Sequence, residues 1–333
     1  MLAWGSGLLV AQNDETADIT VDSPAWYLLQ AFQGPATRNA AALWHLGMEV
    51  DSQDDGYVVA ALLDDYPAEQ AGLRRGDRLV SLDGRPFHPV TSLNAAQTIG
   101  ATVQLLVERE GERVMLTVTP VRENLYDSRR SAFLQSIQEF SAGNKRIAYI
   151  HPWSLSRNLN DVLGFLDVMA DLALSDGLIL DLRDSYGYLS IHHVDAFFPS
   201  RRDLFRVTGD GSTHTQLELT TPPLRDRPYG KPVAVLINGG TAGGAALLAW
   251  QLAKLDRVTT VGEFVEATLQ DYAFVDDSGR GYFTSETASG TVDEQPLDVF
   301  RVEPKLPIPY PLSQTTRSDP QFQAAFNVLL GLI

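Results

Sequence analysis

The sequence of 333 residues contains no cysteine. This absence excludes a thiolate nucleophile, disulfide bridges and cysteine-ligated zinc. Basic residues are scarce as well, because 26 Lys and Arg stand against 42 Asp and Glu, for a formal net charge of −16. Such a balance lacks the basic stripe that holds a phosphate backbone, so no nucleic-acid partner is expected. No cofactor or metal site is predicted, since the paired aspartates lie in turn-like sequence without a calcium-loop pattern.

Long apolar runs are also missing. The opening MLAWGSGLLVAQ is too short to span a bilayer, and no other run approaches the roughly 18 apolar residues of a transmembrane helix. The opening resembles the apolar core of a signal peptide, with Ala11 at a suitable cleavage position, but no basic residue precedes it. Two interpretations of this segment stay open, a remnant of an export signal and an ordinary frayed terminus. The SPAWYLLQAF segment predicts a short amphipathic helix that packs on the core or on a second copy of the chain.

The composition favours a packed, two-domain protein, with 44% hydrophobic and 20% charged residues. Residues 43–122 have the pattern of short strands separated by turn signals. Asp83-Gly84 predicts a two-residue hairpin, because both positions of that turn require positive φ. Glu110-Gly111 joins two further strands, and short helices are expected over residues 67–73 and 92–99. These features predict a small β-rich module.

The residues of this module resemble a PDZ domain. His45-Leu46-Gly47-Met48 is similar to the carboxylate-binding loop, and YPAEQAGLRRGDRLVSLDGRPF to the helix, Gly-Asp turn and strand of bacterial members. The resemblance implies that Leu46, Gly47 and Met48 bind a peptide C-terminus, with loop N–H groups holding the carboxylate and the peptide added as a strand. Leu46 and Met48 would line a pocket for an apolar terminal residue. The plainer alternative is that Gly47 only bends an ordinary strand.

From residue 123 to 333, strands alternate with longer helices, which predicts an α/β core. The apolar strand LILDLR leads into a polar turn at 184–187, and VAVLIN leads into GGTAGGAA and then a helix. Another helix is expected to be capped by Asn160 or Asp161 and to exit at Gly177. Ligands gather at the carboxyl ends of strands in such sheets, so these two turns are the candidate catalytic region.

Three blocks of this second region resemble the carboxyl-terminal processing peptidases, also called tail-specific proteases. They are DGLILDLRDSYGYL, KPVAVLINGGTAGGAALLAWQLAKLDRVTTVGE and VFRVEPKLPIPYP, in the family's order. The resemblance extends over nearly the whole chain. It implies a crotonase-like α/β core beside a PDZ domain, serine peptidase activity on protein C-termini, and an extracytoplasmic location, periplasmic or secreted.

The family's chemistry implies a serine at the strand-to-helix elbow and a lysine that accepts its proton. Aligning the family's G-T-A-S-A-A-E with residues 240–246 places Gly243 at the serine position. Counting along the family's next motif from Val261 places Thr268 at the lysine position. The two positions are 25 residues apart, as the dyad is in the family, so the alignment is in register and both catalytic groups are replaced. None of the four lysines lies between residues 261 and 268.

The resemblance also assigns the oxyanion-hole amides, which would hold the developing negative charge. One belongs to Gly244 and the other to the glycine pair of the family, here Gly187-Tyr188. A Gly-Tyr pair still presents an amide, but Tyr186 and Tyr188 are expected to crowd or line the groove. The cleft therefore looks suited to binding more than to turnover.

Two kinds of residue could substitute for the lost dyad. Thr241 carries a hydroxyl, but the loop is expected to aim it elsewhere, and no base is visible beside it. His192 and His193 could serve as a base or as metal ligands. Neighbouring residues of a helix point in different directions, and no i, i+4 partner accompanies them, so a packing role is favoured.

The favoured function is a catalytically degenerate tail-specific protease homologue that binds peptide or protein C-termini through its PDZ domain and acts as a scaffold or regulator. The alternative is an active serine-type endopeptidase with a non-standard catalytic constellation. The expected division is an N-terminal segment 1–42, a PDZ-like domain 43–122 and a protease-like core 123–333. Whether the chain forms a homo-oligomer stays open.

Overall fold

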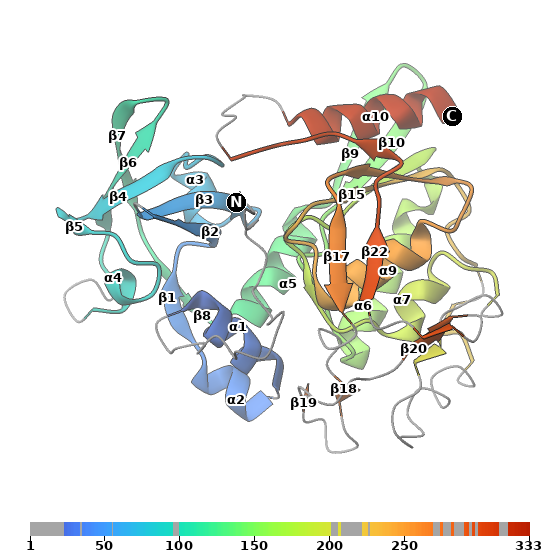
Figure 1. Ribbon diagram of the computed structural model, residues 1–333, viewed down its shortest axis with the longest axis horizontal. Coiled ribbons are helices and arrows are strands. Elements are labelled where there is room, and N and C mark those ends of the chain that lie inside the picture. Colours follow the sequence, from blue (N-terminus) through green and yellow to red (C-terminus); the bar gives the residue numbers. More distant parts are fainter. Residues whose placement is uncertain are drawn as a thin grey trace. The chain divides into compact units, whose positions relative to one another are not determined.

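The computed structural model describes residues 23–33, 35–54, 56–95, 100–200, 206–207, 222–225, 227–268, 274–275, 281–282, 290–292, 295–296, 299–312 and 319–333. The signal-like opening lies outside the described residues. The chain divides into two compact units (Figure 1). Unit 1 comprises Met1–Ser136, Asp277–Gly281 and Tyr310–Ser318, and unit 2 the remaining residues. The division after Ser136 groups one helix, residues 125–135, with unit 1, beyond the boundary expected at residue 122.

The centre of unit 1 is an antiparallel sheet whose order is β2-β3-β4-β6-β7, with β5 paired to β4. Its strands are β2 (Met48–Gln53), β3 (Gly56–Leu62), β4 (Arg78–Leu82), β5 (Arg85–Pro86), β6 (Val103–Arg109) and β7 (Glu112–Val118). Alternate residues of these strands pack into one apolar core with Leu46, Leu73, Phe87 and Leu93. Among the described strands, β2 lies at the outer edge of this sheet.

Both predicted hairpin turns are confirmed. Asp83 and Gly84 have φ values of 48° and 77°, and they connect β4 to β5. Glu110 and Gly111, at 53° and 80°, connect β6 to β7. Positive φ at both central residues is the conformation that matches the twist of the flanking strands.

Helices and a short ribbon complete unit 1. The helices are α1 (Pro24–Gln33), α2 (Pro35–Ala40), α3 (Pro67–Gln70), α4 (Thr91–Asn94) and α5 (Leu125–Gln135), and β1 (Leu43–His45) pairs antiparallel with β8 (Val121–Glu123). Helix α3 is shorter than expected because the chain turns at Gly72, where φ is +82°. Helix α4 ends at Asn94, and residues 96–99 lie outside the described chain. Asn124 caps α5 by accepting a hydrogen bond from the Asp127 amide.

Unit 2 is built on a six-stranded sheet of order β23-β16-β15-β12-β10-β9. The strands are β9 (Gln138–Ala142), β10 (Lys145–Ile150), β12 (Gly177–Asp181), β15 (Val233–Ile237), β16 (Val258–Gly262) and β23 (Leu306–Pro307). All neighbours are parallel except β9 and β10. Every residue of β12 and β15 is buried, as expected for central strands covered on both faces. The predicted α/β core is confirmed.

The helices of unit 2 are α6 (Leu159–Asp171), α7 (Ile191–Asp195), α9 (Gly243–Leu252) and α10 (Pro320–Leu332), with a 3-10 turn η1 (Leu172–Leu174). The cap of α6 is Asn158, two residues before the expected position. The expected exit at Gly177 is wrong, because that residue begins β12. A Cβ there would lie 3.4 Å from Leu329, at ordinary van der Waals distance, so β12 lies against α10 at this point.

Short strand pairs surround this sheet. They are β11 (Ser154–Leu155) with β13 (Tyr186–Gly187), β17 (Val265–Thr268) with β22 (Val299–Val302), β18 (Phe274–Val275) with β19 (Gly281–Tyr282), and β14 (Arg206–Val207) with β20 (Gly290–Val292) and β21 (Gln295–Pro296). Within the part of the chain that is described, no helix has the length and apolarity to cross a membrane.

Candidate functional site

Unit 1 contains a pocket beside the outer strand β2. Its volume is about 30 Å³, room for the tip of a small side chain or about two waters. Its walls come from α1, the β1–β2 loop, β2, α4 and α5, through Pro24, Leu43, His45, Leu46, Gly47, Met48, Glu49, Val50, Leu63, Pro89, Leu93, Leu125 and Arg129. The structure therefore brings together the three residues expected to bind peptide, Leu46, Gly47 and Met48, at one apolar pocket.

The loop at Gly47 is a tightly held left-handed turn. Its φ is +73°, and a Cβ at this position would lie 2.3 Å from the Cβ of Tyr66, so only glycine fits. The carbonyl of Leu46 accepts a hydrogen bond from the Ala68 amide, and that of Gly47 from the Leu63 amide, each at 2.9 Å. Gly47 immediately precedes β2, and hydrogen bonds hold the carbonyls on both sides of this turn.

A chain of buried hydrogen bonds supports this loop from behind. The Gly47 amide donates to His45 Nδ1 at 3.0 Å, which places the imidazole proton on Nε2. His45 Nε2 lies 3.0 Å from Ser128 Oγ, and Ser128 Oγ lies 2.9 Å from the Glu123 carboxylate. The Tyr66 hydroxyl donates to the same carboxylate at 2.7 Å. The loop is thus connected through His45 to the start of α5.

Burial sets the protonation states in this chain of contacts. Desolvation lowers the pKa of His45 to about 4, against the smaller opposing effect of Glu123. The imidazole is therefore neutral at pH 7, as the hydrogen bond from Gly47 requires. Desolvation, followed by the hydrogen bond to Glu123, raises the pKa of Tyr66 to about 12, so its hydroxyl stays a donor.

An ion pair lies at the wall of the same pocket. Arg129 Nη2 of α5 is 2.6 Å from Glu49 Oε1 of β2, and the two side chains are 1% and 26% exposed. The sequence predicts neither Glu49 nor Arg129 as a site residue, and it places His45 in the loop without a role. Glu49 and Arg129 are 80 positions apart, and no local pattern in the sequence places α5 against β2.

Unit 2 contains the turn at which the sequence places the expected elbow. Strand β15 leads to α9, whose first residue is Gly243 with φ +54°. This is the left-handed conformation of a sharp strand-to-helix turn, and a residue with a side chain would be strained there. The backbone shape of an elbow is kept, but residue 243 has no hydroxyl. Thr268 is the last residue of β17, which contacts α9, and the chain beyond it to residue 273 lies outside the described part.

The two expected oxyanion-hole positions, Gly187 and Gly244, do come together. A Cβ at Gly244 would lie 2.7 Å from the Gly187 carbonyl oxygen and 2.3 Å from the Leu189 nitrogen. The Tyr188 amide donates to the Leu155 carbonyl at 3.0 Å, within the pairing of β11 and β13. The Gly187 carbonyl oxygen lies close to Gly244, and the Tyr188 amide is engaged with Leu155, so the Tyr188 amide is not available as one of the donors that an oxyanion needs.

The tyrosines beside these glycines are buried. Tyr186 and Tyr188 are 0% and 2% exposed, and desolvation raises the pKa of Tyr188 to about 12. They pack in the interior of unit 2, edge to face with ring centroids 6.2 Å apart. Of the two expectations, that the rings crowd the groove or that they line it, their burial favours crowding.

The candidate substitutes for the dyad have other roles. The Thr241 hydroxyl donates to the Leu182 carbonyl at 2.8 Å and accepts from the Asn238 amide, so its proton is engaged with backbone. His193 is buried and closes a capping box with Ser190, and desolvation lowers its pKa to about 3. His192 Nδ1 lies 3.0 Å from Asp195. These contacts fit the packing role expected for the two histidines.

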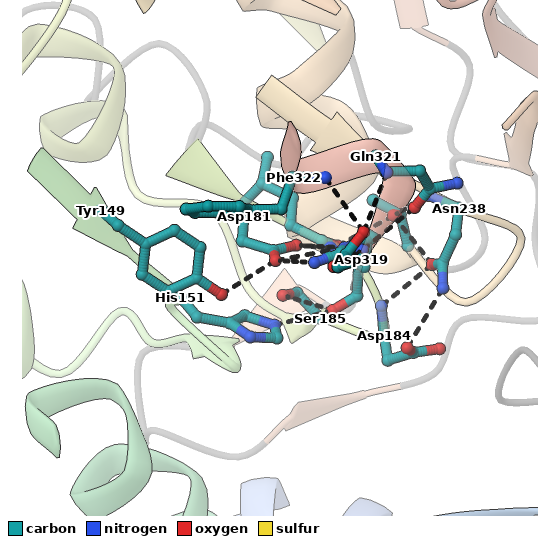
Figure 2. A network of polar contacts seen from close by, with 12 residues as sticks. Tyr149, His151, Asp181, Asp184, Ser185, Asn238, Asp319, Gln321 and Phe322 are labelled. Atoms are coloured by element: carbon teal, nitrogen blue, oxygen red, sulfur yellow. Dashed lines mark hydrogen bonds and ion pairs between the residues drawn. The ribbon is translucent and has the colours of Figure 1, made fainter. Parts of the chain in front are cut away.

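A polar network holds the carboxyl end of β12 (Figure 2). Arg183 forms hydrogen bonds to both oxygens of Asp181, and its other end contacts Asp319 at 2.6 Å and Gln321 at 3.1 Å. The Tyr149 hydroxyl donates to Asp181. Burial works to raise the pKa of Asp181, but the Arg183 charge overcomes it and holds that pKa below its ordinary value. Since Asp319 caps α10, the network fastens this helix to the sheet.

Among the described residues, no group of three or more His, Asp or Glu side chains could hold a metal ion. At these turns of unit 2, backbone groups are held in hydrogen bonds and Asp181 forms a buried ion pair with Arg183. The pocket of unit 1 combines an opening, apolar walls and charged side chains.

Comparison with known proteins agrees with both units. Residues 45–119 match the PDZ domain family, and residues 146–288 match peptidase family S41. The carboxyl-terminal-processing protease of Synechocystis is 24% identical over 308 residues, 86% of this chain and 68% of that protein. Carboxy-terminal processing protease CtpA of Bacillus subtilis is 23% identical over 252 residues, 72% of this chain and 50% of that protein. The chain thus spans between half and about two thirds of these relatives' lengths.

A solved structure of a Bacteroides fragilis protein assigned to the S41 proteases has a similar fold, with a TM-score of 0.52. It is 15% identical and covers 87% of this chain and 84% of that one. The protein therefore consists of a PDZ domain and an α/β domain of the S41 peptidase type. In sequence and domain order it is similar to the carboxyl-terminal processing proteases.

Proposed function

We propose that this protein is a non-catalytic member of its family, which binds the C-termini of peptides or proteins and acts as a scaffold or regulator. The observation that carries the binding function is the apolar pocket formed by Leu46, Gly47 and Met48 beside the outer strand β2. An outer strand can accept an extended peptide through main-chain hydrogen bonds, while the pocket takes the terminal side chain. The pocket volume of about 30 Å³ favours a small apolar residue at the last position.

Loss of catalysis is supported by three features of unit 2. Residue 243 offers no nucleophile, the Tyr188 amide is engaged with Leu155, and the Gly187 carbonyl faces Gly244. Acyl transfer needs a nucleophile and aimed donors together, and this turn has neither arrangement. The competing function is cleavage of other proteins at their C-termini. It would require catalytic groups other than those described above.

A single experiment separates the two functions. The purified full chain is incubated with an unfolded protein and with labelled octapeptides ending in Ala, Val, Leu or Phe, each as free acid and as C-terminal amide. Binding is followed by fluorescence anisotropy, and cleavage by mass spectrometry and by labelling with a fluorophosphonate probe. We expect binding that requires the free carboxylate, without cleavage or labelling.

Cleavage that persists through rigorous purification would overturn the non-catalytic assignment. In that case, Thr241 and His192 are the first residues to replace. Absence of binding to every free-acid peptide would overturn the binding function, whatever the result of the cleavage assay.

A further inference from the structure

The side chains of β2 alternate between the two faces of the unit 1 sheet. Met48 and Val50 pack against the apolar core of this unit. Successive residues of a strand point to opposite faces, so Glu49 and Asp51 lie on the face turned away from that core. Directly paired residues of neighbouring strands share a face, and the register of the sheet therefore shows what accompanies Asp51 there.

A row of directly paired residues crosses this second face. Starting at the outer strand, it consists of Asp51 (β2), Val58 (β3), Arg78 (β4), Glu108 (β6) and Arg113 (β7). Arg78 Nη1 lies 3.9 Å from Glu108 Oε2, and both side chains are partly exposed. Charges of opposite sign thus face one another on β7, β6 and β4, whereas the row ends on β2 with a carboxylate next to the uncharged Val58.

Asp51 follows Val50, the last residue of β2 that lines the pocket. Its carboxylate accepts hydrogen bonds from the Gln53 side chain and the Ser52 amide, and no cation among the described residues contributes to its environment. Burial outweighs these hydrogen bonds and raises the pKa of Asp51 above its ordinary value. Glu49 differs, because it already forms an ion pair with Arg129 at 2.6 Å. Of the two carboxylates of β2, Asp51 is therefore the one that an added cation would stabilise.

The register of a bound peptide on β2 follows from the proposed function. The last residue of the peptide enters the pocket beside Met48, and the preceding residues extend along the outer edge of β2. The peptide ends where β2 begins, so the two strands are antiparallel, as the other strand pairs of this sheet are. Counting residue by residue from Met48, Glu49 lies opposite the residue directly before the last. Asp51 lies opposite the third residue before the last.

From this geometry, and resting on the proposed peptide-binding function, we propose that Asp51 selects peptides whose third residue before the last is Lys or Arg. Such a cation compensates the partly buried carboxylate and extends the row of alternating charges onto the peptide. A basic residue directly before the last gains no comparable partner, since it faces Glu49, which is already paired with Arg129. The partner is thus a protein whose C-terminus combines a small apolar last residue with a basic residue three positions earlier.

The test compares octapeptides of equal net charge. Labelled free-acid octapeptides end in Ala or Val, and a single Lys stands at position 5 or at position 7 in a background of Ser and Gly. The protein's net charge of −16 attracts both isomers, so a difference between them reports the side chain that the Lys faces. We expect the position 5 isomer to bind about two- to fivefold more tightly in anisotropy titrations, because cross-strand charge pairs contribute modestly. Added salt should reduce this preference.

Three variants of the full chain assign the preference to its source. Asp51→Asn keeps the size of the side chain without its charge and should bind both Lys isomers equally. Asp51→Lys should reverse the preference, so that an octapeptide with Glu at position 5 binds more tightly than one with Glu at position 7. Glu108→Gln removes a carboxylate of the same row, three strands away, and should behave as wild type. Circular dichroism checks that each variant is folded, and Asp51→Asn decides alone if Asp51→Lys does not fold.

The outcomes distinguish this inference from the function on which it rests. If wild type binds the two Lys isomers equally, Asp51 selects nothing at this position and the binding function stands. A preference that survives in Asp51→Asn, or that is lost in Glu108→Gln, would assign the selection to another group and overturn the inference. If wild type binds none of the free-acid octapeptides, the proposed function fails and this inference fails with it.

Discussion

The Gly47 amide donates a hydrogen bond to Nδ1 of His45 at 3.0 Å, two residues earlier in the chain. This contact requires an imidazole without a proton on Nδ1, and the burial of His45 provides it by lowering its pKa to about 4. The conformation of the loop at Gly47 is therefore linked to the protonation state of His45. Glu123 faces the other end of this chain of contacts, beyond Ser128, and its charge opposes the effect of burial only in part.

The buried histidines predict that the protein loses stability in mild acid. The pKa values of His45 and His193 are lowered from 6.5 to about 4 and about 3. Between 6.5 and these values the unfolded chain binds protons that the folded chain does not, so the free energy of unfolding falls as pH falls. The expected loss is about 2 kcal/mol per histidine between pH 7.5 and 5. Urea unfolding at the two pH values measures it.

A matched variant isolates the contribution of His45. Asn at position 45 retains an acceptor for the Gly47 amide and does not titrate. In His45→Asn, we expect the free energy of unfolding of unit 1 to depend less on pH. The unfolding transition of unit 2, which contains His193, should keep its pH dependence. An unchanged pH dependence of unit 1 would show that His45 is not the titrating group.

Two glycines of the PDZ domain should respond very differently to alanine. Both Gly47 and Gly72 have positive φ, but a Cβ at Gly47 would collide with Tyr66, whereas at Gly72 nothing lies within 4 Å. Gly72→Ala should cost only the backbone strain, about 1 kcal/mol. Gly47→Ala should cost more and should abolish peptide binding, because Tyr66 must move. Thermal unfolding and anisotropy of both variants test this, and equal losses in the two would contradict it.

Placing the family's serine and lysine at positions 243 and 268 should not produce catalysis. Gly243→Ser places a side chain at φ +54° and should lower the free energy of unfolding by about 1 kcal/mol. We expect neither this variant nor Gly243→Ser with Thr268→Lys to cleave peptides, because Tyr188 donates to Leu155 and the Gly187 carbonyl faces Gly244. The measurement is fluorophosphonate labelling and peptide turnover. Turnover by the double variant would mean that the oxyanion site is intact.

The buried ion pair of unit 2 should contribute far more to stability than an exposed one. Asp181→Asn leaves the Arg183 guanidinium without its fully buried partner and should cost about 3–5 kcal/mol. Glu139→Gln, which removes an exposed pair with Arg146 at 3.7 Å, should change stability by less than about 1 kcal/mol. Chemical unfolding of both variants gives the comparison. Similar effects would show that the network around Asp181 does not fasten α10 to the sheet.

Much of the architecture could be predicted from local sequence signals. Asp83-Gly84 and Glu110-Gly111 specify their hairpins because few residue pairs accept positive φ at both positions. The apolar runs of β12 and β15 predict buried parallel strands because both of their faces are covered. The signals at helix ends were weaker. Asn158, and not Asn160 or Asp161, caps α6, and Gly177 begins β12 and is not a helix exit.

The sequence by itself determined the order of the two domains and the resemblance to the carboxyl-terminal processing proteases, and it predicts that Gly243 and Thr268 stand in place of the catalytic pair. These conclusions follow from residue identity and spacing, which do not depend on how the chain packs. Only the tertiary structure decided that Arg129 of α5 lies against Glu49 of β2 and that His45 holds the Gly47 amide. It also decided that Tyr188 is engaged with Leu155, since hydrogen bonds and burial between distant segments arise from packing that no local pattern encodes.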